Sequence, residues 1–89
     1  MDEGRERTDV LERLRKIEGQ VRGIHRMIEE ERSCNEILTQ ITAIRGALNR
    51  VGLKILEKHT RGSVAQAIQN GQGEPAIEDV MQVLLKFLG

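Results

Sequence analysis

Apolar residues recur every three to four positions through the middle of the chain, from residue 34 to residue 59. The steps between them are 4, 3, 4, 3 and 4, a repeat typical of a seam where one helix packs on another. The pattern therefore predicts one long helix that begins near Cys34, passes His59 and ends at about Gln69. The residues of the seam are Ile37, Ile41, Ile44, Leu48, Val51 and Ile55.

A second run with the same period lies before the first one. Its members are Val10, Leu14, Ile17, Val21, Ile24 and Ile28. Thr8 directly precedes this run and is suited to capping a helix N-terminus. We therefore expect a helix over residues 8–30, preceded by a charged and flexible N-terminus over residues 1–7.

Turn signals separate these helices from each other and from a third one. Ser33 and Glu36 have the spacing of a capping box, which places the start of the second helix at Cys34. The sequence NGQG at residues 70–73 is a clear loop, and Pro75 fits the first position of a helix over residues 74–88. The predicted fold class is all-α, a long antiparallel α-hairpin plus a short third helix, with residues 8–89 forming a single three-helix domain.

Length and composition limit what the chain can do alone. With 89 residues, one Phe and no Trp or Tyr, it buries little core by itself, so we expect oligomers. Its 14 basic and 14 acidic residues cancel, so net charge indicates no partner. A single Cys excludes an internal disulfide and favours a reducing compartment. Without an 18-residue apolar run or a signal peptide, we expect a soluble, cytoplasmic protein with no membrane partner.

Cys34 and His59 point in the same direction from opposite ends of the predicted second helix. They are 25 residues apart, about 37 Å along a helix axis, so they cannot meet within one copy of it. Twenty-five steps of 100° nevertheless return to within roughly 20° of the same face. An antiparallel pair of these helices, crossing near Gly46 and Ala47, would bring Cys34 of one protomer to His59 of the other.

The chemistry of this pairing favours a metal but leaves alternatives. A thiolate and an imidazole suit Cu(I) or Zn(II). Ser63 lies one helical turn after His59, but its hydroxyl is a poor third ligand for either metal. The site could be a weak metal site, a site that other groups complete, or a site that handles an electrophile at Cys34. In the plainest alternative there is no site, Cys34 is an ordinary thiol and His59 caps a surface.

Basic residues are concentrated in the first two predicted helices, while the third has only Lys86 beside three acidic residues. A neutral chain can therefore present a basic face, which an oligomer repeats. Because aromatic residues are almost absent, phosphates of duplex DNA are a better partner than stacked single strands. The alternative is a solvated face neutralised by pairs such as Glu12–Lys16 and Glu18–Arg22.

Several stretches together resemble the CsoR/RcnR/FrmR repressors. The resemblance covers residues 10–88, nearly the whole chain. The first stretch, RLRKIEGQVRGI at residues 13–24, is similar to the signature of the family's first helix. The others are RMIEE at residues 26–30, Cys34, LTQI at 38–41, AIRGAL at 43–48, His59 and NGQG at 70–73.

The resemblance implies all-α dimers that pair into a tetramer and an operator-binding repressor that an inducer releases from DNA. In the copper-sensing branch the inducer site is a Cys from one protomer with a His and a second Cys from the other. Cys34 and His59 match the first two, Ser63 replaces the second Cys, and Asp79 falls where that branch has an acidic residue behind the ligands. The extra histidines of the nickel and cobalt branch, the N-terminal Pro of the formaldehyde branch and the second Cys of the persulfide branch are missing.

We therefore expect a DNA-binding repressor that leaves double-stranded operator DNA when an inducer, with Cu(I) preferred over Zn(II), binds Cys34 and His59. Ligation across the dimer would tilt the helical pairs and misalign their basic faces with the DNA. The residues expected to contact operator DNA are Arg13, Arg15, Lys16, Arg45 and Arg50. The alternatives are a repressor that senses formaldehyde or reactive sulfur at Cys34 and an oligomeric metal-binding protein that does not touch DNA. An enzyme is not expected, because no nucleophile, base and acid occur together.

Overall fold

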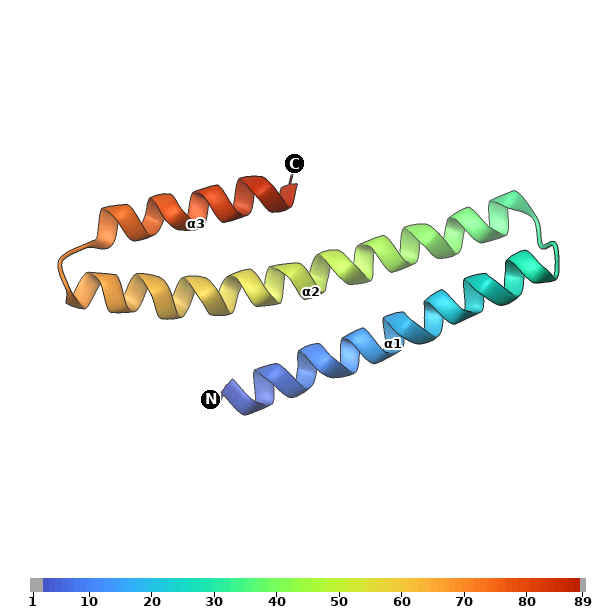
Figure 1. Ribbon diagram of the computed structural model, residues 1–89, viewed down its shortest axis with the longest axis horizontal. Helices are drawn as coiled ribbons and strands as arrows, with labels where there is room; N and C mark the ends of the chain where they lie inside the picture. Colours follow the sequence, from blue (N-terminus) through green and yellow to red (C-terminus); the bar gives the residue numbers. More distant parts are fainter. Residues whose placement is uncertain (1–2, 89) are drawn as a thin grey trace. The chain divides into compact units, whose positions relative to one another are not determined.

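The computed structural model describes residues 3–88 and contains three α-helices in that range, which Figure 1 labels along the chain. They are α1 (Glu3–Glu29), α2 (Cys34–Gln69) and α3 (Gly73–Leu88). The predicted all-α fold with a long α1–α2 hairpin and a shorter third helix is confirmed. The chain divides into two compact units at Val51, within α2, so residues 1–51 and residues 52–89 are described separately.

The first unit has a small apolar core between α1 and α2. Ile17, Ile44 and Val51 are its buried members, with 5 to 7% of their surface exposed. Four half-buried residues pack against them: Val10, Leu14, Ile24 and Ala47. All but Ala47 belong to the two predicted seams, so the 3.5-residue period identified the packed faces correctly. Other seam residues stay exposed, among them Val21, Ile28, Ile41 and Leu48.

The start of α1 differs from the sequence prediction. The helix begins at Glu3, five residues before Thr8. The hydroxyl of Thr8 donates a hydrogen bond of 2.9 Å to the carbonyl of Gly4, one turn earlier in the same helix. The prediction that Thr8 caps the helix is therefore wrong, because its side chain satisfies a carbonyl inside the helix and not a free N–H at its end. Residues 1–2 of the predicted flexible segment lie outside the described residues.

The turn between α1 and α2 is closed by a Schellman motif. The N–H of Arg32 donates to the carbonyl of Met27 at 2.9 Å, and the N–H of Glu31 donates to that of Ile28 at 3.1 Å. The motif requires a left-handed residue, and here Glu31 takes that conformation with φ of 55°. A residue with a side chain is less stable than glycine in this conformation, so the turn stores some backbone strain.

The turn between α2 and α3 repeats the motif with glycine. Gln72 donates to the carbonyl of Ala67 at 2.7 Å, and Gly71 is the left-handed residue with φ of 73°. The predicted loop is thus confirmed in place, although α3 begins at Gly73, one residue earlier than expected. Pro75 is accordingly the third residue of the helix and not the first, still within the turn that tolerates proline.

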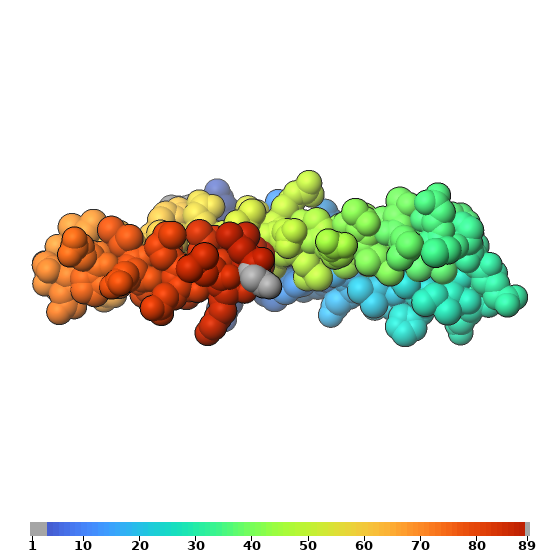
Figure 2. All heavy atoms as spheres, turned by 90° about the horizontal axis from the view of Figure 1, so that it is seen from above, coloured from blue at the N-terminus to red at the C-terminus, as the bar shows by residue number. Residues whose placement is uncertain are grey.

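The second unit packs α3 against the later part of α2. The ring of Phe87 lies so close to Gly52 that a methyl group at position 52 would overlap its Cε1 and Cζ atoms. A side chain at position 52 would therefore force the ring of Phe87 to move. No described residue of α3 is buried, and Figure 2 shows the side of this helix that faces away from α2 and is open to solvent.

Membrane insertion finds no support in the helices. Across residues 3–88, none of them combines the length and the apolar character that a bilayer crossing requires.

Candidate metal centre and basic surface

Cys34 is the first residue of α2, and a capping box fixes the backbone around it. The hydroxyl of Ser33 accepts the N–H of Glu36 at 3.2 Å, and the Glu36 carboxylate accepts the N–H of Ser33 at 3.3 Å. These are the two reciprocal bonds that the sequence predicts. The thiol of Cys34 is free and exposed at the positive end of the helix dipole.

Arg32, in the turn before α2, stabilises this cap. Its guanidinium donates to the second carboxylate oxygen of Glu36 and lies 3.8 Å from Glu30. The hydrogen bond from Arg32, followed by those from the Ser33 hydroxyl and N–H, lowers the pKa of Glu36 to about 2. The same hydrogen bond and the charge of Glu36 raise the pKa of Arg32. Sequence reasoning did not include Arg32, although its spacing of four residues from Glu36 was a usable signal.

His59 is paired with Asp79 across the second unit. The Nε2 atom of His59, on α2, lies 3.3 Å from Oδ2 of Asp79, on α3, and about half of each side chain is exposed. Twenty residues separate them in sequence, so the contact depends on how α3 packs on α2. An acceptor at Nε2 favours the tautomer that carries its proton there, which leaves the lone pair of Nδ1 free.

Ser63 follows His59 by one turn of α2 and is half-buried. Helical spacing places both side chains on the same side of α2. Cys34 belongs to the first compact unit, whereas His59, Ser63 and Asp79 belong to the second. Within the described part of the chain, no group of three or more His, Cys, Asp or Glu side chains is placed to hold a metal ion.

The five predicted DNA-binding residues all lie in the first unit, on α1 and on the first part of α2. Arg13 is half-buried, and its Nε donates to Asp9 at 3.2 Å. The other four are exposed: Arg15, Lys16, Arg45 and Arg50. Arg13 and Arg15 are two residues apart, about 200° around a helix, so they belong to different faces of α1.

The ion pairs that the alternative of a solvated, self-paired face would require are not among those recorded on α1 in residues 3–29. Over residues 3–88, the ion pairs recorded on this helix include Arg13 with Asp9 but neither Lys16 with Glu12 nor Arg22 with Glu18. The structure therefore gives less support to the alternative, in which the basic side chains of α1 are neutralised by glutamates of the same helix.

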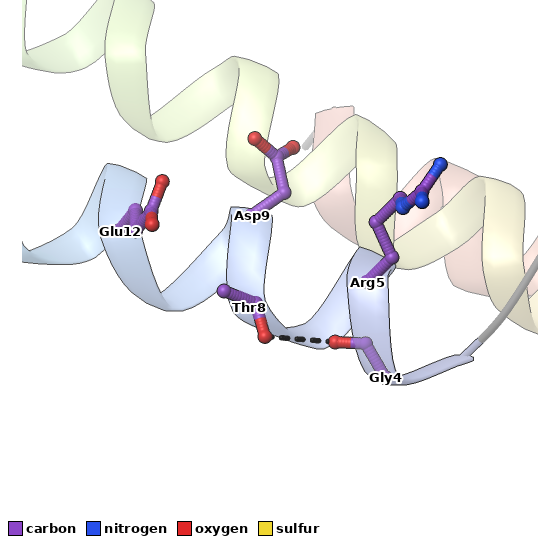
Figure 3. A pocket seen from close by; sticks show the side chains of 5 residues that line it. All are labelled: Gly4, Arg5, Thr8, Asp9 and Glu12. Carbon is purple, nitrogen blue, oxygen red and sulfur yellow. Dashed lines mark hydrogen bonds between the residues drawn. The ribbon is translucent and has the colours of Figure 1, made fainter.

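A shallow hollow on the first turns of α1 holds none of the predicted site residues. Figure 3 shows the side chains around it and the hydrogen bond from Thr8 to Gly4. It is open to solvent and contains neither a thiol nor an imidazole, so it is not the metal centre. The residues that line it are Gly4, Arg5, Thr8, Asp9 and Glu12.

Comparison with known proteins places this chain in a family. The family model for the metal-sensitive transcriptional repressor matches residues 6–86. The copper-sensing transcriptional repressor CsoR of Bacillus subtilis is 46% identical over 83 residues, which cover 93% of this chain and 82% of that protein.

Two solved structures are similar throughout. The copper-sensing repressor CsoR with Cu(I) from Geobacillus thermodenitrificans superimposes with a TM-score of 0.86 at 42% identity, covering 100% of this chain and 93% of that one. The nickel-responsive transcriptional regulator InrS gives a TM-score of 0.82 at 36% identity over 90% of both chains. The chain therefore belongs to the family of metal-sensitive transcriptional repressors.

Proposed function

We propose that the chain is a copper-sensing repressor of the CsoR type. In this proposal it binds operator DNA in the cytoplasm as an oligomer and leaves the DNA when Cys34 and His59 take up Cu(I) between two protomers. Membership of a repressor family, not an enzyme family, supports a binding function. The same membership favours a DNA-binding repressor over a metal-binding protein that does not touch DNA.

The contact between His59 and Asp79 is the observation that carries the proposal. Histidines that bind metals usually donate their second ring N–H to a carboxylate, which orients the ring and raises its basicity. Asp79 lies 3.3 Å from Nε2 of His59. It can accept that proton and leave Nδ1 as the ligand atom.

The remaining donors fit Cu(I) as a soft ion. Cys34 supplies an exposed thiol, which binds as the thiolate. Cu(I) strongly prefers thiolate and imidazole ligands and is stable with few of them. Ser63 adds a neutral oxygen where a third soft ligand is expected. We propose that Cys34 and His59 provide most of the binding energy and that Ser63 contributes little.

Two chains are needed for this site. Cys34 and His59 stand 25 residues apart on one continuous helix, α2. An antiparallel α2 from a second protomer would provide the missing partner at each end. The exposed apolar residues support such an assembly, because Leu48 and Ile55 are 45% and 55% exposed in the single chain. Further assembly of the dimer into a tetramer follows from the family resemblance.

Operator binding is assigned to the basic residues of the first unit: Arg13, Arg15, Lys16, Arg45 and Arg50. Their exposed guanidinium and ammonium groups suit the phosphates of duplex DNA. A bond between Cys34 of one chain and His59 of another joins the ends of two α2 helices. It shifts the population toward whichever arrangement brings these ligands together, and DNA is released because that arrangement binds it less tightly.

The test is an anaerobic titration of the protein on its operator with Cu(I), Zn(II), Ni(II) and formaldehyde, read as release of labelled DNA. The proposal expects release by Cu(I) at the lowest concentration. Release by formaldehyde alone would instead support an electrophile sensor that reacts at Cys34. A chain that never binds its operator would disprove the repressor function itself.

Two variants locate the site. Cys34→Ala should abolish the response to Cu(I) and leave operator binding intact, because Cys34 is exposed and makes no contact that the core needs. Ser63→Cys should restore two thiolates beside one imidazole and raise the affinity for Cu(I) by orders of magnitude. If Ser63→Cys binds Cu(I) no more tightly than the native chain, position 63 is not part of the site.

A further inference from the structure

A stripe of arginines runs along the outer face of α1. Arg15, Gly19, Arg22 and Arg26 follow one another in steps of 4, 3 and 4, the same period as the apolar seam of this helix. At 100° per residue they lie roughly 140° to 200° around the helix from Ile17, the buried core residue. All four are exposed, which agrees with a face directed away from the core.

The three arginines of this stripe make no close contact with a carboxylate in residues 3–88, although Glu12, Glu18 and Glu29 lie three or four positions from them. Over residues 3–88, the structure records no ion pair for Arg15, Arg22 or Arg26. Arg13, on another face of α1, is instead bonded to Asp9 at 3.2 Å. At 1.5 Å per residue, Arg22 lies about 10 Å along the axis from Arg15 and about 6 Å from Arg26. The stripe therefore places three guanidinium groups within about three turns of helix.

Packing within the chain does not explain Gly19, which interrupts the stripe. A methyl group at position 19 would meet only the end of the Arg22 side chain, at 3.9 Å. Alanine would thus fit, and it would stabilise the helix relative to glycine. Only the flexible end of the Arg22 side chain lies near Gly19, so an external group that displaces it can approach the helix backbone closely there.

We propose that this stripe binds the sugar-phosphate backbone of duplex DNA. It extends the operator interface from Arg15 to Arg22 and Arg26, with Gly19 admitting the DNA backbone between them. The inference rests on the proposed repressor function. A polyanion is the partner that complements three unpaired guanidinium groups, and the absence of aromatic side chains from α1 disfavours stacked single strands. Contacts to phosphates position the protein and do not read sequence.

The first test removes charge from the stripe. The double variant Arg22→Gln/Arg26→Gln should weaken binding about tenfold at 0.15 M salt and reduce the salt slope by about two for each chain that contacts DNA. The loss should be equal for the operator and for a scrambled duplex. Lys86→Gln, an exposed basic residue on α3, is the control that removes a charge elsewhere and should change neither quantity.

The second test separates helix stability from DNA contact. Gly19→Ala and Gly62→Ala both add a methyl group to a helix without a clash, so both should raise the melting temperature. Only Gly19→Ala should also weaken DNA binding, because only position 19 lies in the stripe. A stabilised helix that binds DNA less tightly is a result that a purely structural glycine would not produce.

The outcomes distinguish the inference from the proposed function. If Arg22→Gln/Arg26→Gln leaves affinity and salt slope unchanged while Arg50→Ala weakens binding, the stripe is not part of the interface and the repressor function stands. If the double variant changes the oligomeric state in light scattering, the stripe is a contact between subunits and the inference is wrong. If the native chain binds no duplex at low salt, the repressor function fails as well.

Discussion

Replacing Asp79 with Asn tests the role of the contact between His59 and Asp79. The change keeps the size of the side chain and removes its charge. Asn is a weaker acceptor for the Nε2–H of His59, and its amide can turn to present N–H groups that favour the other tautomer. If Nδ1 of His59 binds Cu(I), the variant should hold the metal less tightly while its helices and its operator affinity stay the same.

The size of the effect follows from the exposure of the pair. Loss of a hydrogen bond behind a metal-binding histidine typically costs 10- to 100-fold in affinity. Here the two atoms are 3.3 Å apart, and the side chains of His59 and Asp79 are 46% and 56% exposed. Water therefore competes for this bond, and the loss should be at the lower end, about tenfold or about 1.4 kcal/mol. Without copper, the exposed pair should contribute less than about 1 kcal/mol to stability.

The assay is an anaerobic competition titration of Cu(I) against a chromophoric chelator, with operator release measured in parallel. Both midpoints should shift by the same factor in Asp79→Asn. Glu78→Gln removes the same charge from the neighbouring exposed residue of α3 and should bind Cu(I) as the native chain does. The reasoning is refuted if Asp79→Asn keeps its full affinity, or if Glu78→Gln loses as much.

Three further predictions concern stability and pH, with melting measured at one fixed protein concentration. Gly52→Ala should destabilise the fold by about 1 kcal/mol, because its overlap with Phe87 outweighs the gain in helix propensity. Gly62→Ala has open space around it and should be stabilising. Equal shifts in melting temperature for the two variants would contradict this packing. Glu31→Gly should raise stability by about 1 kcal/mol by relieving the left-handed turn residue, and a lower melting temperature would argue against the strain. The pKa of Glu36 is lowered to about 2, so the stability that its carboxylate gives the helix cap is fully present above its ordinary pKa of 4.5 and should be lost as the pH falls toward 2. A midpoint near 4.5 in a titration followed by the carboxyl carbon chemical shift would show that the cap is not formed.

The helices could be read from the sequence because their signals are local. A 3.5-residue repeat of apolar residues marked the packed faces, including the buried Ile17, Ile44 and Val51. The capping box at Ser33 was also predicted correctly, and the loop predicted at residues 70–73 lies where expected, although α3 already begins at Gly73. Each depends on hydrogen bonds between residues three to five positions apart, and local side-chain chemistry decides these.

The start of α1 is a local feature that was predicted wrongly from the sequence. A threonine before an apolar run can cap a helix, or it can bond to a carbonyl one turn earlier, and both use the same hydroxyl. The structure shows the second arrangement, with Thr8 bonded to Gly4. The left-handed Glu31 was equally hidden, because glycine or asparagine is the usual signal for that conformation.

The candidate site also combines features that local sequence signals predict with features that only helix packing decides. Spacing on one helix was enough to predict that Cys34 and His59 share a face, and a family resemblance, not spacing, drew attention to Asp79. The contact of Asp79 with His59 and the close approach of Phe87 to Gly52 were decided only by the packing of α3 on α2. Sequence periodicity shows which side of a helix is apolar, but the rotation and depth at which two helices pack depend on all the side chains between them. For this reason the sequence by itself determined the helices and their faces, whereas only the tertiary structure decided which residues of different helices meet.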